Sequence, residues 1–387
     1  MKPLLLLPLA GLGIRFTDEG FSTPKQLLEV DGDITCLEKT LRSIKNIHSF
    51  NLIAYVRDSL VADHLAEILQ KITINYHIIN GGKTKSPIET VQKILNSGHS
   101  FVTDNADVYV HTLDVDTPEE FFIDLKYPIT TYTFKANSTN YSYVEILDGY
   151  VTQIVGQNGV SKHANVGIYG YGPVNKLREF CKKSLALSEL VSAEITLVDI
   201  YKLYLAEKIK IKAIEINAVH IFGTPLEYHF CRDFVYPNAN VKNCFLFSDH
   251  SGIATKNKLN KALVELGFNT TDLGSFINEN DSDYPDSAFL AYEAKVKNGG
   301  YIFGSCSTGQ GACIALNKMP GIFSALIYDR NSFKMAIMHN CANAFSFPNS
   351  IWENQSLDIV MNELKTTHFI GGRHQNRLIK LLGYSGG

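Results

Sequence analysis

The sequence feature that most limits the possible folds is a regular alternation of short apolar segments with amphipathic helical patterns. In the first half of the chain the apolar segments lie at residues 4–9, 51–56, 74–79 and 101–102, with helical patterns such as 59–69 and 87–95 between them. Alternation of this kind predicts a doubly wound α/β sheet with right-handed crossovers. Because ligands of such sheets bind at the carboxyl ends of the strands, the polar loops that follow the apolar segments are the candidate sites.

Length and composition limit the class of protein. A chain of 387 residues is too long for one ordinary core, which predicts two domains or three. A hydrophobic content of 45% with 19% charged residues is typical of a soluble globular protein. The net charge of −3 offers no broad basic surface, so we expect neither nucleic acid nor a membrane as a partner.

The cysteines and the N-terminal segment indicate the compartment. The seven cysteines contain no CxxC pair, which argues against a zinc site and a disulfide framework, so we expect a reducing cytoplasm. The opening MKPLLLLPLAG resembles a signal peptide, but its apolar run is short and passes directly into a glycine loop. We interpret it as the first buried strand. No apolar segment approaches the length that is needed to span a bilayer.

The loop after the first strand has the residues of a phosphate site. Gly11 and Gly13 allow the backbone to close around phosphates, and Arg15 and Lys25 supply positive charge for a polyphosphate. The loop is neither a Walker A motif nor a complete GxGxxG motif, because Phe16 stands where the third glycine belongs. The combination of GLGIRF with PKQLLEVDG directly after the first strand resembles the signature of sugar-phosphate nucleotidyltransferases.

This resemblance implies a set of nucleotide and metal ligands. Residues 81–90 match the loop that holds the base and sugar of the nucleotide, so the implied nucleotide-binding residues are Ala10, Gly11, Gly13, Gly82 and Thr90. Asp107 is expected at a strand end on the same edge of the sheet, and the resemblance marks it as the Mg²⁺ ligand, since Mg²⁺ prefers hard oxygen ligands. Asp114 and Asp116 compete for that role, and a solvated surface loop is the other interpretation of this pair.

The next segments resemble the sugar side of the same family. Residues 141–146 and 150–155 flank an Asp-Gly turn, which predicts a β-hairpin. The segments 165–169, 192–195 and 222–227 then match, in order, the sugar-binding segments of the family. The resemblance therefore implies Gly167, Glu194 and Thr224 as substrate-binding residues.

The implied reaction is nucleotidyl transfer. An oxygen of a sugar or polyol phosphate attacks the α-phosphorus of an NTP and pyrophosphate leaves, while Mg²⁺, Arg15 and Lys25 stabilise the developing charge. The PKQ triplet is similar to that of the cytidylyltransferases that act on pentitol and erythritol phosphates, so CTP is the expected nucleotide.

A second α/β series follows a linker. Residues 232–242 contain turn formers without a helical period, which separates a first domain at 1–235 from a second at 242–387. The second domain opens with a buried strand at 244–247, a polar Ser-Asp-His-Ser-Gly loop, and an amphipathic helix at 256–266. Later, the strand at 301–303 leads into GSCSTGQG, a strand-to-helix loop of the kind that binds anions and activates thiols. Cys306 in this loop is either a reactive thiol or an ordinary buried cysteine.

The motifs DHSG, DLGS, DYPD, CSTGQG, NKMPG, HNCAN and GGRHQNR occur in this order between residues 244 and 380. This order resembles the type B ribose-5-phosphate isomerases and the galactose-6-phosphate isomerase subunits. The resemblance implies a Rossmann-like parallel-sheet domain that needs no cofactor and forms homodimers or higher homo-oligomers with active sites at the shared interface.

The resemblance also implies a role for each motif residue. The proton-transferring base would be Cys306, and the enediolate would be bound by Thr308 and the N–H groups of residues 309–311, including Gly309 and Gly311. The ring opener would be His339, the sugar hydroxyls would contact Asp249 and Asn340, and the phosphate would contact His250, Arg373 and Arg377. A solvated C-terminal basic face is the alternative for the two arginines.

Two departures from the second family bear on activity. Cys341 stands where the family has Asp, and Ser350 stands where a further phosphate-binding Arg is usual. We therefore hold two hypotheses: a bifunctional enzyme that makes an activated sugar for a capsule or similar polysaccharide, or a nucleotidyltransferase with a non-catalytic sugar-phosphate-binding or dimerisation domain. A third possibility is that the first domain is the inactive one.

Overall fold

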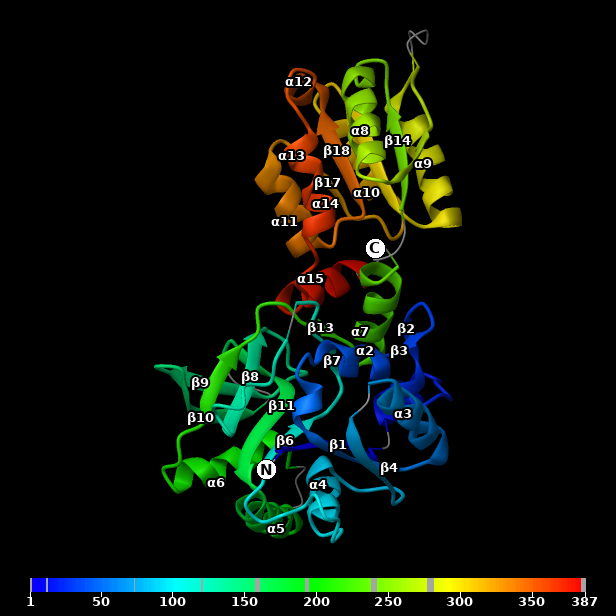
Figure 1. Ribbon diagram of the computed structural model, residues 1–387. Helices are drawn as coiled ribbons and strands as arrows, with labels where there is room; N and C mark the ends of the chain where they lie inside the picture. The colour runs from blue at the N-terminus through cyan, green and yellow to red at the C-terminus, as the bar shows by residue number, and fades with distance from the viewer. Residues whose placement is uncertain are drawn as a thin grey trace. The chain divides into compact units, whose positions relative to one another are not determined.

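The computed structural model describes residues 2–11, 13–72, 74–119, 121–156, 161–191, 195–237, 242–276 and 282–383. The chain divides into two compact units, Met1–Tyr228 and His229–Gly387 (Figure 1). Both units are α/β, as expected from the alternation of strands and helices. In the part of the chain that the structure describes, no helix combines the length and the apolar character that crossing a membrane requires.

The first unit is built on a mixed sheet. Among its described residues the strands follow the order β5-β4-β1-β6-β11-β8-β12-β10-β9. The strands are β1 (Leu4–Leu9), β4 (Asn51–Val56), β5 (Asn75–Asn80), β6 (Asp107–His111), β8 (Ile129–Lys135), β9 (Tyr143–Leu147), β10 (Tyr150–Gly156), β11 (His163–Pro173) and β12 (Lys212–Glu215). Strands β5, β4, β1 and β6 are parallel, and β11 is antiparallel to both β6 and β8. The doubly wound half thus continues into a mainly antiparallel half, in which β12 pairs in parallel with β8.

The central strand β1 is buried on both faces. Leu5 and Leu7 pack into one apolar cluster, and Leu4 and Leu6 pack into another on the opposite face. Side chains alternate along a strand, so a continuous apolar run gives both faces of the sheet a core. This explains why the opening segment is uninterrupted by polar residues.

Helices and small strand pairs surround the sheet of the first unit. The helices are α1 (Ile14–Asp18), α2 (Cys36–Ser43), α3 (Ser59–Ile72), α4 (Pro87–Leu95), α5 (Val174–Val191), α6 (Ile200–Ala206) and α7 (Pro225–Phe230), and the last two residues of α7 already belong to the second unit. The small pairs are β2 (Glu29–Asp31) with β3 (Ile34–Thr35) and β7 (Val115–Asp116) with β13 (His220–Ile221). The predicted hairpin is confirmed as β9 and β10, with both turn residues, Asp148 and Gly149, at positive φ.

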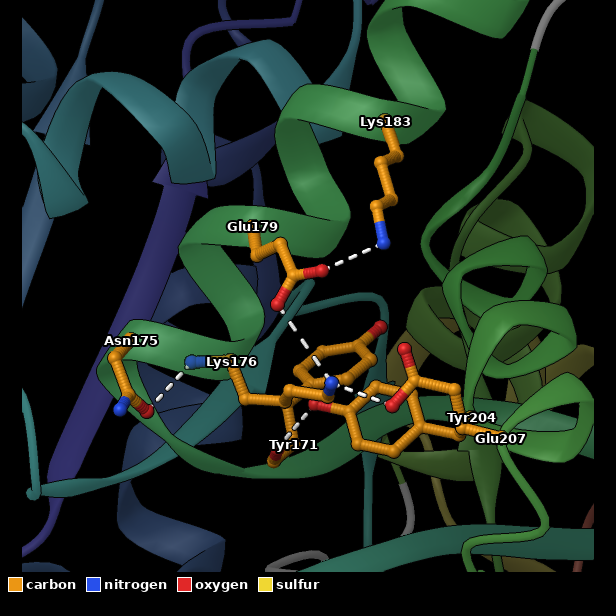
Figure 2. A network of polar contacts seen from close by, with 7 residues as sticks. All are labelled: Tyr171, Asn175, Lys176, Glu179, Lys183, Tyr204 and Glu207. Carbon is orange, nitrogen blue, oxygen red and sulfur yellow. Dashed lines mark hydrogen bonds and ion pairs between the residues drawn. The ribbon is translucent and has the colours of Figure 1, made fainter.

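A polar network joins α5 to the end of α6 at the surface of the first unit. Figure 2 shows the Lys176 ammonium between the carboxylates of Glu179 and Glu207, at 3.6 and 2.5 Å. In the same view the hydroxyl of Tyr204 donates to the backbone carbonyl of Tyr171 on β11. The exposed ion pairs and the hydrogen bond between the buried tyrosines both hold α6 against its neighbours. This part of the unit therefore stabilises the sheet.

The second unit is a parallel sheet covered on both faces. Its described strands follow the order β15-β14-β16-β18-β17, with bounds β14 (Asn243–Ser248), β15 (Asn269–Asp272), β16 (Tyr301–Cys306), β17 (Ser324–Leu326) and β18 (Ala344–Pro348). The helices are α8 (Ile253–Glu265), α9 (Tyr284–Asn298), α10 (Gln310–Asn317), α11 (Arg330–Asn340), α12 (Asn349–Trp352), α13 (Asp358–Met361), α14 (Glu363–Thr366) and α15 (Arg373–Leu382). Residues of α8, α11 and α13 pack on one face, and residues of α9 and α10 on the other. The strand order reverses between β14 and β16, and the crevice expected there lies at their carboxyl ends.

A π-helical turn at Cys231–Val235 belongs to the second unit. Phe230 packs in an apolar cluster with Cys341, Phe369 and Leu378. The Cys341 thiol donates to the carbonyl of Phe234 at 3.4 Å. The expected linker at 232–242 is therefore wrong in its first residues, because Cys231–Val235 form a helical turn that packs near α15 and the end of α11.

Candidate active sites

The first unit has a cavity of about 450 Å³ at the carboxyl ends of its parallel strands. Its walls come from the loops that follow β1, β4, β5 and β6. These loops meet because β1 and β4 are parallel, with Leu9 opposite Val56 at their ends. The described residues that line the cavity include four cations, Arg15, Lys25, Arg57 and Lys85, and one carboxylate, Asp114. The cavity therefore suits a polyanion.

The glycine loop after β1 forms one wall of this cavity. Gly11 and Gly13 both line it, whereas Ala10 is buried behind the loop. Gly13 has φ 64°, a left-handed conformation that other residues adopt only with strain, and it immediately precedes α1. A guanidinium nitrogen of Arg57 donates to the Gly11 carbonyl at 3.3 Å. Arg57 lies after β4 and was not predicted from the sequence, because no motif marks it.

Lys25 joins the PKQ segment to the loop after β6. Its ammonium pairs with the Asp114 carboxylate. Burial lowers the pKa of Lys25 to about 8, with Cys36 and Glu227 opposing the shift and Arg15 adding to it. The Lys25 charge is therefore held in a site where it titrates much closer to neutral pH than an exposed lysine.

The expected position of Asp107 is wrong. Asp107 is the first residue of β6, and β6 is parallel to β1 with Val108 opposite Leu4. It therefore lies at the amino edge of the sheet, opposite the glycine loop, and burial raises its pKa. The predicted strand at 101–102 is also wrong, and β6 begins only at Asp107. This shift of the strand places Asp114, not Asp107, beyond its carboxyl end.

The competing acidic residues have different surroundings. Asp114 lines the cavity of about 450 Å³, which is called the nucleotide-side cavity below because the family resemblance assigns its glycine loop to the nucleotide, and also a second, adjoining pocket. Asp116 is 4% exposed and lies 3.6 Å from a ring nitrogen of His220, within the β7 and β13 pair. Asp114 is thus accessible from the cavity, whereas Asp116 is buried within the strand pair and contributes to its packing.

The loop before α4 forms the other side of the cavity. Thr84, Lys85 and Ser86 line it, and Ser86 caps α4 by accepting from the Glu89 N–H. Thr90 is 1% exposed, and its hydroxyl bonds to Thr84 Oγ1 at 2.6 Å and to the Ser86 carbonyl at 3.1 Å. Thr90 therefore holds this loop in place from below. Gly82 has φ 78° and is not among the residues that line the cavity.

The second pocket, of about 190 Å³, contains residues that the family resemblance assigns to sugar binding, and it is called the sugar-side pocket below. Two of the predicted substrate-binding residues, Gly167 and Thr224, line it. The third, Glu194, lies outside the described residues. The residues that line both hollows are Arg15, Pro87, Thr112, Asp114 and Gly223. The cavity and the pocket therefore meet at a shared wall that carries a cation and a carboxylate.

Close contacts explain why glycine occupies position 167 and how Thr224 is held in the sugar-side pocket. Gly167 has φ 90°, and a Cβ there would lie 2.2 Å from Thr112 Oγ1, so only glycine fits. The Thr224 N–H donates to Glu227 Oε2 at 2.9 Å, and the Tyr141 hydroxyl donates to Glu227 Oε1 at 2.5 Å.

Several lining residues were missed as site residues. Asn165 accepts from the Thr131 hydroxyl at 2.6 Å and donates to the Ser142 carbonyl at 2.8 Å. Asn165 lines the pocket together with Tyr141 and Ser142. Asn165 belongs to one of the matched sugar-side segments, whereas Tyr141 and Ser142 begin the first segment of the predicted hairpin. The hairpin pattern alone does not distinguish lining residues from exposed ones.

In the second unit, Cys306 lies at the carboxyl end of β16 and is 5% exposed. Thr308 and Gly309 follow it and lead into α10. Gly309 has φ 70°, and a Cβ there would lie 2.6 Å from Leu326 and 3.0 Å from the Pro348 nitrogen. A Cβ at Gly311 would lie 2.5 Å from the Tyr284 ring. The glycines therefore allow this loop to pack closely against its neighbours.

The loop after β14 lies beside the Cys306 loop. Asp249 Oδ1 accepts from the Ser251 N–H and hydroxyl and from the Gly252 N–H, at 2.9, 2.6 and 3.0 Å. A Cβ at Gly252 would lie 2.3 Å from the Ser305 carbonyl, so the two loops touch. His250 is exposed in the same loop. This carboxyl edge therefore gathers Asp249, His250, Cys306 and Thr308.

The remaining predicted residues lie at the amino edge of the same sheet. α11 connects the parallel strands β17 and β18, so its last turn, with His339 and Asn340, returns to the amino edge. The His339 ring stacks on His374 with centroids 4.2 Å apart. Burial, together with the nearby Arg373 and Arg377, lowers the pKa of His339. Burial, His339 and the same arginines lower the pKa of His374 to about 4.

The two groups of predicted isomerase residues are therefore separated within one chain. Cys306 and its neighbours occupy the carboxyl edge, whereas His339, Asn340, Arg373 and Arg377 occupy the amino edge. A cationic cluster at the end of one α/β layer cannot reach a substrate at the opposite end of the same layer.

The two departures from the family pattern lie at different edges. Cys341 is 9% exposed, has φ 46°, and lies beside Phe234. Burial raises its pKa to about 12, and Lys295 opposes the shift. Ser350 is exposed, and its N–H donates to the Ser307 carbonyl at 3.0 Å, which joins the loop after β18 to the Cys306 loop.

The first unit has the fold of a known enzyme structure. The crystal structure of a nucleoside-diphosphate-sugar pyrophosphorylase from Vibrio cholerae RC9 matches with a TM-score of 0.53 and 20% identity, over 59% of this chain and 98% of that chain. A match at this identity establishes the fold, and the expected mixed-sheet nucleotidyltransferase fold is confirmed.

The second unit matches sugar-phosphate isomerases in sequence. The model of the family described as Ribose/Galactose Isomerase matches residues 244–381. A probable ribose-5-phosphate isomerase B of Mycoplasma genitalium is 35% identical over 145 residues, which are 37% of this chain and 95% of that protein. A putative sugar phosphate isomerase of Bacillus subtilis is 34% identical over 139 residues, or 35% of this chain and 93% of that protein. Through its second unit, the chain belongs to the ribose/galactose isomerase family.

Proposed function

We propose that the chain is a bifunctional enzyme of activated-sugar biosynthesis. The first unit would transfer a nucleotidyl group from an NTP, with CTP expected, to a sugar or polyol phosphate, and the second would interconvert an aldose and a ketose phosphate. The observation that carries the first activity is the shared wall of the two hollows, where Arg15 and Asp114 line both. A capsule or similar polysaccharide is the expected destination of the product.

The shared wall suits an in-line displacement. With the NTP in the larger cavity and the acceptor in the smaller pocket, a phosphate oxygen of the acceptor would attack the α-phosphorus. The bond to pyrophosphate then breaks, and pyrophosphate leaves on the nucleotide side. Both reactants are anions, so Arg15 and Lys25 offset their repulsion and stabilise the charge that develops on the leaving group.

The residues present fit a magnesium ion at Asp114. The Asp114 side chain is 40% exposed at the shared wall. The described residues contain no group of three or more His, Cys, Asp or Glu side chains that could hold a metal ion, so substrate phosphates would have to supply the other ligands. Mg²⁺ is commonly held by one or two carboxylates together with substrate phosphates, which is what this wall offers. When bound, the ion would neutralise phosphate charge. Asp107, at the opposite edge of the sheet, does not fit this role.

The second unit offers the groups for proton transfer between C1 and C2 of a sugar phosphate. Cys306, as the thiolate, would remove the proton from one carbon and return it to the other, and the N–H groups at the start of α10 would bind the enediolate oxygen. His339 would open the sugar ring, but it lies at the other edge of the sheet. We therefore propose a homodimer in which the Cys306 edge of one copy meets the His339 edge of the other.

Two assays test the two activities separately. NMR in deuterium oxide should detect exchange of a C1 proton of ribulose 5-phosphate or a related ketose phosphate with the wild type and not with Cys306→Ala. Pyrophosphate release with each NTP in turn, with and without a pentitol or sugar phosphate, should select one nucleotide. Absence of exchange with every ketose phosphate would rule out the isomerase activity, and absence of pyrophosphate release would rule out the transferase.

A second candidate function is a nucleotidyltransferase whose second unit binds a sugar phosphate without converting it. Cys341 and Ser350, which replace an acidic and a basic residue of the family pattern, favour this candidate. It predicts that sugar phosphates alter the rate of pyrophosphate release while the NMR spectrum shows no proton exchange.

A further inference from the structure

Three lysines gather around two tyrosine rings at the surface of the first unit. The Lys212 ammonium lies over both rings, 5.5 Å from the centroid of Tyr127 and 4.8 Å from that of Tyr150. The Lys126 ammonium lies 5.5 Å from the centroid of Tyr127. The Lys210 ammonium lies 5.4 Å from the centroid of Tyr150. These five residues, called the lysine–tyrosine cluster below, come from the starts of β8, β10 and β12 and from the residues just before them.

The pairing of β10 with β12 explains how two of the lysines reach a tyrosine ring. Residues 209–212 read Ile-Lys-Ile-Lys, and side chains alternate along an extended segment. The isoleucines therefore face the core and the lysines face the opposite side. Ile211 is fully buried, and its carbonyl accepts from the Val151 N–H at 3.0 Å. This bond holds the segment beside β10, where Lys212 is paired directly with Tyr150.

The positive charge of the lysine–tyrosine cluster is not balanced by acidic side chains. Within the part of the chain that the structure describes, its three lysines form no ion pair and its two tyrosine hydroxyls form no hydrogen bond. Asp148, in the turn before β10, is exposed and does not pair with them. A cation–π contact stabilises an ammonium group but leaves its charge and its N–H donors available. The cluster therefore combines neighbouring cations with donors that no protein group uses, and an anion is the complementary ligand.

The lysine–tyrosine cluster lies at the amino edge of the sheet. Lys212 opens β12, which runs parallel to β8. β11 is antiparallel to both β8 and β6, and its last residues lie opposite the first residues of both strands. The starts of β8 and β12 are therefore at the same edge as Asp107, opposite the glycine loop. No residue of the cluster lines the nucleotide-side cavity or the sugar-side pocket, so substrates of these two sites do not account for it.

We propose that the lysine–tyrosine cluster is a second anion site of the first unit, which binds a phosphorylated ligand. Lysine ammonium groups bind phosphate as point charges, and tyrosine hydroxyls can donate to further phosphate oxygens. Three positive charges suit a ligand that carries two phosphates or presents several close together. The phosphates can belong to a soluble compound or to lipid headgroups, which the experiment distinguishes. The inference does not depend on the proposed reactions, because the cluster belongs to neither of their sites.

NMR of the full chain with ¹³C-methylated lysines can observe the cluster separately from other phosphate sites. Reductive methylation keeps each ammonium group charged and gives each lysine its own methyl signal. The variants Lys126→Arg, Lys210→Arg and Lys212→Arg assign the three signals, because each variant lacks one of them. Titration with pyrophosphate at constant ionic strength should shift all three signals with one dissociation constant. The signal of Lys45, an exposed lysine without an ion pair in the described part of the chain, should not move.

Variants of equal charge separate the cluster from the general surface charge. Lys212→Gln removes the ammonium that both rings share and should weaken pyrophosphate binding at least about fivefold, as expected for one charge contact near the surface. The signals of Lys126 and Lys210 report this change. Lys45→Gln removes the same charge elsewhere and should leave the dissociation constant within about twofold, because salt screens distant charges. Thermal unfolding of each variant checks that it is folded.

Two further measurements identify the source of the phosphate. Shifts of the three signals with fructose 1,6-bisphosphate, without sedimentation on vesicles, would assign the site to soluble phosphate esters. Sedimentation with vesicles of phosphatidylglycerol and phosphatidylcholine, but not with phosphatidylcholine alone or for Lys212→Gln, would assign it to lipid headgroups. The inference would be overturned if none of these probes binds, if sodium chloride at equal ionic strength gives the same shifts, or if folded Lys212→Gln binds as the wild type does.

Discussion

The Lys25 ammonium pairs with the Asp114 carboxylate, which joins the loop after the glycine motif to the loop after β6. Both residues line the nucleotide-side cavity, and Asp114 also lines the sugar-side pocket. This pair therefore stands where a triphosphate and an acceptor phosphate would meet. Two predictions follow from the ionisation and position of its members.

The first prediction concerns pH. Burial lowers the pKa of Lys25 to about 8, so the ammonium is present below that pH and lost as pH rises through it. Stabilisation of the phosphates by Lys25 should therefore decline above about pH 8, and kcat/KM for the NTP should decline with it. Pyrophosphate release by the free enzyme on both sides of this pH measures the effect.

Lys25→Arg is the matched variant for this prediction, because arginine keeps its charge at all accessible pH values. Its activity should lack the decline above pH 8, even if its absolute rate is lower. A decline of the same size in the arginine variant would assign the titration to another group.

The second prediction separates Asp114 from Asp107. Asp114→Asn should lower kcat for pyrophosphate release by about a hundredfold or more, in the range found for loss of one electrostatic stabiliser of a transition state. Asp107→Asn should leave kcat within about threefold, because Asp107 lies at the opposite edge of the sheet and contributes at most to folding. A larger loss in the Asp107 variant than in the Asp114 variant would contradict the assignment.

Asp107 also illustrates what the sequence could not provide. The composition and the alternation of segments predicted two α/β units, and the motif order predicted the families of both. The role of a carboxylate near a strand depends on whether it precedes or follows that strand. An error of a few residues in the predicted strand boundary therefore places the carboxylate at the wrong edge of the sheet. Because Val108 and Val110 continue the apolar pattern, the strand begins at Asp107 rather than ending there.

The separation of Cys306 from His339 has a similar cause. Each motif could be recognised by its residues, but the edge of the sheet that it occupies depends on the direction of the element that carries it. Cys306 ends a strand, and His339 ends the helix that runs back between two parallel strands. The edge of the sheet at which each residue lies can therefore be assigned only when the strands and their order are known.

A third prediction uses two glycines of the second unit that share a conformation. Gly309 and Gly267 have φ 70° and 83°, but a Cβ would meet Leu326 and the Pro348 backbone at Gly309 and nothing within 4 Å at Gly267. Gly267→Ala should cost about 1–2 kcal/mol of unfolding free energy for the left-handed conformation alone. Gly309→Ala should cost about 1–3 kcal/mol more, because the methyl group also displaces its neighbours. Chemical denaturation of both variants gives the comparison, and equal losses would contradict it.

The fourth prediction tests whether two copies complete the isomerase site. Cys306→Ala and His339→Ala should each abolish exchange of the C2 proton of a cyclic aldose phosphate such as ribose 5-phosphate, because the exchange needs ring opening by His339 as well as proton removal by Cys306. The two residues lie at opposite edges of one chain. When the variants are co-expressed with different affinity tags and the mixed dimers are purified, one of the two shared sites contains both intact residues. The mixed dimers should then regain about half of the wild-type rate per dimer, as the symmetry of a closed dimer requires.

The control for this experiment is a chain that carries both substitutions, co-expressed with the Cys306→Ala variant. Its mixed dimers contain no site with both groups intact, so they should remain inactive. Recovery in the first mixture and not in the second would require that each site draws Cys306 from one chain and His339 from the other. If neither mixture recovers although both contain folded dimers, the two edges do not meet, and His339 would have to act in a site that the Cys306 loop does not share.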